Sequence, residues 1–199
     1  MNNNKIGIIG GGAWGTALGS NLSELNKNVV LWSRNKKVVN SINMNNINDI
    51  YLPNIKLNKN LKSTNSEETL RDFDILIFAV PTQYIRSIII LLNKIITKKT
   101  IIINCSKGIE KETLFFPSSI FKDELPCSSF AILSGPTFAT EVAKNLPSAI
   151  TLACDSNLSH VELAKKLRSE SLRLYFSEDT IGVELGGALK NIIAIAAGI

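Results

Sequence analysis

The sequence contains few of the residues that build metal sites or disulfide frameworks. Among its 199 residues there is a single histidine, His160, and three widely spaced cysteines, Cys105, Cys127 and Cys154, without a Cys-x-x-Cys pair. An odd number of separated cysteines is typical of reduced thiols in a cytoplasmic protein. A histidine without a Cys or His neighbour in the sequence gives no support to a metal site. We therefore expect a cytoplasmic protein with no metal.

Concentrated positive charge and long uncharged runs are also missing. The formal net charge is +5, but the lysines and arginines are scattered, so nucleic acid is not an expected partner. The isoleucine-rich residues 85–103 are interrupted by charges, and no uncharged run reaches the length of a membrane span. Residues 5–19 resemble a signal peptide only superficially, because three consecutive glycines would break its helix. We expect no membrane span and no secretion.

A glycine motif stands near the start of the chain. Residues 6–9 are an apolar run of strand type, and Gly10, Gly12 and Gly15 follow in the spacing GxGxxG, before apolar residues at helical spacing. In this context Gly10 allows a tight turn, Gly12 lets a pyrophosphate approach, and Gly15 lets the helix pack on the strand. The helix N-terminus would then bind the phosphates. The motif indicates a dinucleotide site, although glycine turns without ligands also occur.

The end of the second apolar run, residues 28–32, bears on the choice of cofactor. An acidic residue at this point would bind the ribose 2′-hydroxyl of NAD, but the sequence has Ser33 and Arg34 followed by two lysines. Cations suit a 2′-phosphate, so we expect NADP or NAD, with NADPH favoured by Arg34. A solvated turn with surface cations is the alternative.

Apolar runs and helical segments alternate along the rest of the chain, which predicts βαβ units and a parallel sheet. The fold class is therefore α/β, a Rossmann-type, doubly wound, mostly parallel sheet. Small and polar clusters follow several strands, at 10–15, 33–34, 81–82, 106–108 and 134–137, and we expect them to share one cleft. The predicted later strands are 74–80, 100–104, 130–133, 149–153 and 172–176.

Two intervening segments carry weaker signals. The asparagine-rich residues 43–62 are expected to form a long surface connection. Thr64 and Glu67 have the spacing of a capping box and predict the start of a short helix.

The last helix, expected over 181–199 after a start at 177–180, has an unusual composition. Gly186 and Gly187 precede Lys190 by one turn, and adjacent glycines inside a helix indicate close approach by a ligand or another backbone. A partly desolvated Lys190 would be suited to proton transfer. A surface lysine beside a helix contact explains the pattern equally well.

Taken together, these motifs closely resemble NAD(P)-dependent glycerol-3-phosphate dehydrogenase of the bacterial type. The resemblance runs in the family order along the whole chain, and the last three motifs are more specific than the glycine pattern. The matching stretches are GGGAWGTAL at 10–18, LWSR at 31–34, YLP at 51–53, AVP at 79–81, SKGIE at 106–110, SGPTFA at 134–139 and LKN at 189–191.

The resemblance implies an oxidoreductase that interconverts sn-glycerol 3-phosphate and dihydroxyacetone phosphate with NAD(P)H, in glycerophospholipid synthesis. It assigns catalysis to Lys190 and Lys107, which would also bind the substrate, with Lys107 lying between cofactor and substrate. It further implies that Gly10, Gly12, Ala13, Trp14, Gly15, Arg34 and Ala139 bind the cofactor, and that Gly135 and Thr137 face the substrate.

The family continues beyond this helix into a helical domain that helps to bind the substrate, so we expect residues 1–178 to form the cofactor domain and 179–199 the first helix of a truncated second domain. The full-length form is a possible homodimer. One alternative function is a truncated, catalytically impaired NAD(P)-binding module; another is a dehydrogenase of the β-hydroxyacid type, against which SKGIE and SGPTFA argue.

Overall fold

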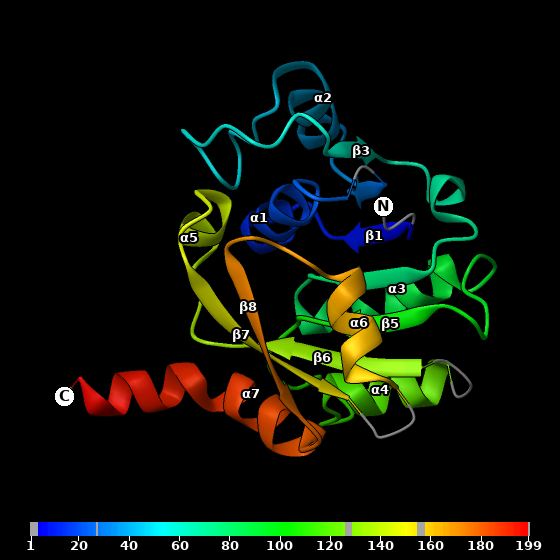
Figure 1. The fold of residues 1–199 in the computed structure, drawn as a ribbon. Helices are drawn as coiled ribbons and strands as arrows, with labels where there is room; N and C mark the ends of the chain where they lie inside the picture. Colours follow the sequence, from blue (N-terminus) through cyan, green and yellow to red (C-terminus); the bar gives the residue numbers. More distant parts are fainter. Residues whose placement is uncertain (1–3, 27, 126–128, 155–157, 199) are drawn as a thin grey trace.

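The computed structural model describes residues 4–26, 28–125, 129–154 and 158–198. Across these residues eight strands form one sheet in the order β3-β2-β1-β4-β5-β6-β7-β8, with helices on both faces (Figure 1). This is the predicted Rossmann-type α/β fold. The strands are β1 (Ile6–Ile9), β2 (Val29–Trp32), β3 (Lys62–Thr64), β4 (Ile75–Phe78), β5 (Ile101–Asn104), β6 (Ser129–Ser134), β7 (Ser148–Cys154) and β8 (Leu172–Ser177).

The sheet is parallel from β3 to β6, and β7 then runs antiparallel to β6. The central strands read as apolar runs because both of their faces are covered. In β4, for example, Ile75 and Ile77 belong to one core cluster, and Leu76 and Phe78 to the cluster on the other face. The helices are α1 (Ala13–Leu22), α2 (Lys36–Asn45), α3 (Ile85–Leu92), α4 (Pro117–Glu124), α5 (Ala139–Ala143), α6 (His160–Lys166) and α7 (Thr180–Ala197), with short 3-10 turns η1 (Glu67–Leu70) and η2 (Thr82–Tyr84).

The strand order reverses beside β1, which pairs with β2 on one side and β4 on the other. In open parallel sheets this reversal leaves a crevice at the carboxyl ends of the strands, where ligands bind. The glycine turn after β1 and the segment after β4 lie at this point. The topology thus places the predicted clusters around one edge of the sheet.

Two expectations for the intervening segments need correction. The segment after α2 is not simply a surface connection, because Leu52, Ile55, Leu57 and Leu61 are buried in the same core cluster as α1. The asparagines conceal these apolar residues in the composition. Thr64 does not cap a helix: it ends β3, its Oγ1 accepts a hydrogen bond from the backbone of Ser66, and only the single 3-10 turn η1 follows.

Of the cysteines, Cys105 and Cys154 are buried, and neither forms a disulfide within the described residues. Cys127 lies outside the described residues. Among the described residues, no group of three or more His, Cys, Asp or Glu side chains is placed to hold a metal ion.

The last helix begins as predicted, with the Asp179 carboxylate accepting a hydrogen bond from the backbone of Gly182 at 2.7 Å. In the part of the chain that the structure describes, α7 is the one helix long and apolar enough to cross a membrane by length and composition, with a mean hydropathy of 1.3. Its window still contains two charged residues, Glu184 and Lys190. Its first half packs against β6 and β7, and its second half extends away from the sheet (Figure 1).

Candidate functional site

The glycine turn after β1 has the geometry that its sequence predicts. Gly10 has φ +124°, a conformation that side chains rarely adopt, and an added Cβ would lie 2.5 Å from the carbonyl oxygen of Ala79. At Gly15 a Cβ would lie 2.0 Å from the carbonyl oxygen of Gly10, so α1 approaches the turn only because this side chain is missing. A Cβ on Gly12 would meet nothing within 4 Å. Gly12 therefore leaves an open space at the start of α1, where a ligand can reach the backbone.

A buried asparagine, which sequence reasoning missed, braces this turn. The side-chain amide of Asn48 donates to the carbonyl oxygen of Gly11 at 3.0 Å and to the Thr16 hydroxyl at 2.7 Å. Its own carbonyl accepts from the backbone of Tyr51. Asn48 is fully buried, so these bonds satisfy groups that water does not reach. The segment after α2 is thereby attached to the glycine turn.

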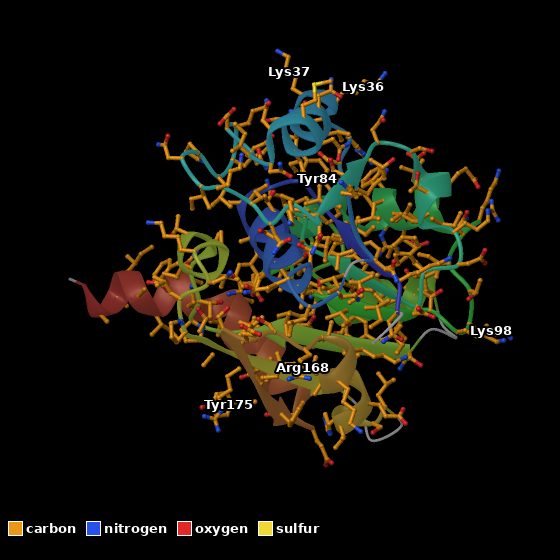
Figure 2. The ribbon with its side chains drawn as sticks, turned by 45° about the horizontal axis from the view of Figure 1, so that its top comes forward. Lys36, Lys37, Tyr84, Lys98, Arg168 and Tyr175 are labelled. Atoms are coloured by element: carbon orange, nitrogen blue, oxygen red, sulfur yellow. The ribbon has the colours of Figure 1, made fainter. Side chains whose placement is uncertain are left out.

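One cavity, of about 490 Å³, opens between the glycine turn, the end of β2 and the start of η2. Arg34 lines it together with Gly10 and Gly12, as expected for the adenosine end of a dinucleotide. The neighbouring Lys36 and Lys37 are not among its lining residues, and they point outward from α2 in Figure 2. Among the residues that line this cavity, Arg34 is the cation. The cavity is also lined by Gly11, Trp32, Ser33, Asn35, Tyr51, Ala79, Val80, Pro81, Tyr84 and Ile88.

A second cavity, of about 350 Å³, continues from the same place, because Ala79 and Val80 line both. It gathers residues from the ends of β4, β5 and β6, which are far apart in the sequence. Six predicted site residues line it, namely Ala13, Trp14, Lys107, Gly135, Thr137 and Ala139, beside Cys105, Ser106, Leu133, Ser134, Phe138 and Ile150.

Lys107 is the cation of this second cavity. Its ammonium donates to the carbonyl oxygen of Gly135 at 3.2 Å, and its own carbonyl oxygen accepts from the Thr82 hydroxyl at 2.8 Å. The pKa of Lys107 is lowered, first because partial burial disfavours the ammonium and second because the charge of Lys190 lies near. A lysine with a lowered pKa releases its proton more readily, which suits a group that acts on a carbonyl or hydroxyl oxygen.

The thiol of Cys105 forms part of the wall. Burial raises its pKa to about 12, partly offset by a hydrogen bond with Trp14 and by the charge of Lys107. The thiol is therefore protonated at neutral pH and a poor nucleophile. Its contact holds the indole of Trp14 at the cavity.

Lys190 stands beside this cavity and does not line it. Its Nζ lies 5.8 Å from the ring centroid of Phe138, which does line the cavity. One turn earlier, a Cβ on Gly187 would lie 2.9 Å from the Ser134 hydroxyl and 3.7 Å from Cγ of Lys107. Close packing thus explains why residue 187 is glycine. The same reason does not apply to Gly186, where a Cβ would meet nothing within 4 Å.

The structure therefore brings the predicted site residues to one edge of the sheet. Gly15 lies behind the turn as a packing residue, and Lys190 lies at the side. Sequence reasoning gave no role to Asn48, Phe138 or Glu184, the buried acid of α7. A carboxylate inside an apolar helix was the available signal for Glu184. Asn48 stands among other asparagines and offered none, and Phe138 offered none beyond its place in the SGPTFA motif.

The arrangement fits a dinucleotide cofactor on its own chemistry. The open space at Gly12 faces the N-terminus of α1, whose first N–H groups have no partner within the helix. Two connected cavities extend from this point, one with Arg34 and one with Lys107. The site therefore suits an elongated anionic ligand, with its phosphates at Gly12 and one polar end near each of Arg34 and Lys107.

Comparison with known proteins agrees with this architecture. Residues 5–160 match the family model described as NAD-dependent glycerol-3-phosphate dehydrogenase N-terminus, and residues 179–199 match the C-terminus model of that family. A glycerol-3-phosphate dehydrogenase (NAD(P)+) from Paramagnetospirillum magneticum is 42% identical over 195 residues, covering 98% of this chain and 71% of the relative. A protein of the same name from Ehrlichia canis is 43% identical over 197 residues, covering 98% of this chain and 61% of the relative.

Solved structures agree as well. The glycerol-3-phosphate dehydrogenase of Coxiella burnetii superposes with a TM-score of 0.89 at 34% identity, covering 98% of this chain and 60% of that one. The Plasmodium falciparum enzyme gives a TM-score of 0.89 at 29% identity, covering 99% of this chain and 58% of the other. The chain thus spans about three fifths of the length of most of these proteins. With the glycine turn, the two cavities and the matched segments together, the chain belongs to the NAD-dependent glycerol-3-phosphate dehydrogenase family.

Proposed function

We propose that this chain carries the cofactor site and the proton-transfer lysine of an oxidoreductase that interconverts sn-glycerol 3-phosphate and dihydroxyacetone phosphate with NADPH or NADH. One observation supports it above the others: Lys107 and Lys190 come together beside a cavity that continues into the glycine turn. A polar reaction centre next to a dinucleotide site is what hydride transfer to a carbonyl requires.

Cofactor binding is assigned to the first of the two connected cavities and the glycine turn. Gly10, Gly12 and Gly15 shape the turn for the pyrophosphate, and Arg34 serves the adenosine end. Ala13, Trp14 and Ala139 line the second cavity and would face the nicotinamide end. When bound, the nicotinamide supplies or accepts the hydride at C2 of the substrate.

Proton transfer is assigned to Lys190. As an ammonium it donates a proton to the C2 oxygen in the reduction, and as a neutral amine it removes the hydroxyl proton in the oxidation. Lys107 assists by placing positive charge near the same oxygen as negative charge develops on it. Gly135 and Thr137, which line the cavity beside Lys107, would contact the substrate.

The wider setting follows from this activity. We propose that residues 1–178 form the cofactor domain and that α7 begins a helical substrate domain, consistent with the separate family models for the two segments. The product would serve glycerophospholipid synthesis in the cytoplasm. A homodimer stays a prediction for the full-length form, and sedimentation analysis would test it.

The competing proposal is a module that binds NADPH without turnover. The test combines calorimetric titration of the chain with NADPH and an assay of NADPH oxidation with dihydroxyacetone phosphate. Binding with turnover supports the enzyme, and binding without turnover supports the module. Turnover of a 3-hydroxy acid with NAD+, but none of glycerol 3-phosphate, would instead indicate the β-hydroxyacid type.

A further inference from the structure

Glu184 is a buried carboxylate of α7, and within the part of the chain that the structure describes it forms no ion pair. It is 7% exposed, and its partner is Ser118, whose backbone N–H donates to Oε1 at 2.9 Å while its hydroxyl donates to Oε2. Burial raises the pKa of Glu184, and the two hydrogen bonds from Ser118 partly offset this effect. Burying an acid is unfavourable unless its hydrogen bonds are satisfied, so this contact needs an explanation.

The contact completes the N-terminus of α4. The first N–H groups of a helix have no partner within it, and the N-cap residue of α4, Phe116, has no side chain that could accept from them. Glu184 accepts from the N–H of Ser118 instead, and its carboxylate faces the positive end of the helix dipole. A side chain of α7 thus caps α4, through two residues that are 66 positions apart in the sequence.

The other end of α4 is also fixed. Arg86, on α3, donates to Asp123 at 2.8 Å and to Glu124, both in the last turn of α4. The same guanidinium binds Glu110 through two nitrogens. Because α4 is held to α3 at one end, the Glu184 contact ties α7 to a firmly attached element of the sheet domain.

Lys190 depends on where α7 lies. It lies six positions after Glu184, which is about 9 Å along a helix. Gly187, halfway between, packs closely on Ser134 and Lys107. Beyond Lys190 every described residue of α7 is exposed. The anchoring of α7 therefore comes from its first turns, immediately before the lysine.

We infer that Glu184 is a positioning residue, which through Ser118 fastens the start of α7 to α4 and thereby holds Lys190 beside Phe138 and the cavity lined by Lys107. In Figure 1, α4 lies next to the first turns of α7, before that helix leaves the sheet. The catalytic consequence rests on the proposed function. The placement of Lys190 does not rest on the proposed function, and it can be measured separately.

The experiment compares four variants of the full chain. Glu184→Ala removes both hydrogen bonds of the contact. Ser118→Ala removes the hydroxyl bond and keeps the backbone N–H bond, and Glu184→Gln keeps an acceptor of the same length. Ser119→Ala is the matched control, because Ser119 is the exposed neighbour of Ser118 on the same helix. All are studied well below their unfolding temperatures, so that global unfolding does not contribute.

The first measurement is the rate at which an amine-selective reagent modifies Lys190, followed by mass spectrometry. Lys98, which points into solvent at a distant edge of the molecule, is the reference in the same sample (Figure 2). We expect several-fold faster labelling of Lys190 relative to Lys98 in Glu184→Ala, and a smaller increase in Ser118→Ala, which keeps the backbone bond. Wild-type labelling is expected in Glu184→Gln and Ser119→Ala. Unchanged labelling in both disrupting variants would overturn the inference.

The second measurement is turnover of dihydroxyacetone phosphate with NADPH. A displaced lysine should lower kcat on the order of 10-fold and leave the KM for NADPH within about twofold, with recovery in Glu184→Gln. Equal losses in kcat and in NADPH affinity, or no recovery in Glu184→Gln, would overturn the positioning role. Absence of turnover in the wild type contradicts the proposed function alone, and the labelling result then decides the placement of Lys190 by itself.

Discussion

The glycine turn and α7 carry the two halves of the proposed chemistry, and they are held in opposite ways. The turn is buried between β1, α1 and β4, and Asn48 braces it from the side. Most of α7 is exposed, and it touches the sheet domain only through its first turns. Cofactor binding is thus assigned to a rigid element, and proton transfer to one held by a few contacts.

This difference teaches that binding and turnover can be disturbed independently. A change in the turn acts on the cofactor through the backbone itself, because glycine conformation and space create the site. A change in α7 acts on the position of one amine. Substitutions should therefore divide into those that alter affinity for NADPH and those that alter the rate with NADPH bound.

The largest expected effect is that of Lys190→Ala. Removal of a general acid–base group should lower the turnover number by on the order of 10²–10⁴-fold, with the affinity for NADPH within about twofold of the wild type. Steady-state kinetics and calorimetric titration measure the two quantities, and Lys98→Ala is the control. Turnover within a few-fold of wild type would move proton transfer to Lys107 or to another residue.

Gly12→Val should have the converse effect. Its side chain enters space that is open, so the thermal midpoint should stay near that of the wild type, while NADPH affinity falls by on the order of 100-fold. Gly15→Ala is the matched comparison: its Cβ would meet the Gly10 carbonyl, and we expect a loss of about 1–3 kcal/mol in unfolding free energy. Normal NADPH affinity in a folded Gly12→Val variant would contradict the assignment of the turn.

Arg34→Ala should discriminate between the two cofactors. A charged hydrogen bond to the 2′-phosphate is available only with NADPH, so its affinity should fall about 10-fold more than that of NADH. Lys37→Ala, which changes an outward-pointing lysine two positions beyond the cavity-lining Asn35, should leave both affinities unchanged. Equal losses of NADPH and NADH in Arg34→Ala would indicate contact with the adenine instead.

The smallest expected effect concerns the pH dependence of stability. The pKa of Glu184 is raised in the folded state above its ordinary value of 4.5, so between these two values the folded protein holds a proton that the unfolded chain has lost. Stability contributed by this group therefore falls as pH rises through that interval, by at most about 1.4 kcal/mol per pH unit. Urea unfolding at several pH values should show wild type losing stability relative to Glu184→Gln. A constant difference across pH would refute the raised pKa.

Local sequence patterns predicted most of this architecture, and the reason is physical. Buried parallel strands must be apolar on both faces, and a turn such as that at Gly10 requires glycine, so both leave a mark in a few consecutive residues. The contacts of Asn48 and Glu184 leave no such mark. Each contact joins segments tens of residues apart, and a single polar residue in the sequence does not reveal its partner. For the same reason the buried leucines and isoleucines between α2 and β3 were hidden among asparagines.

The two tryptophans of the sequence, Trp14 and Trp32, line different cavities of the site. Indole emission changes with its surroundings, so the chain contains an intrinsic fluorophore at each end of the proposed cofactor site. Trp14→Phe would leave the signal of the adenosine end, and Trp32→Phe that of the nicotinamide end. Titration of each variant with adenosine fragments and with whole cofactor would then follow the filling of each cavity separately, without any added label.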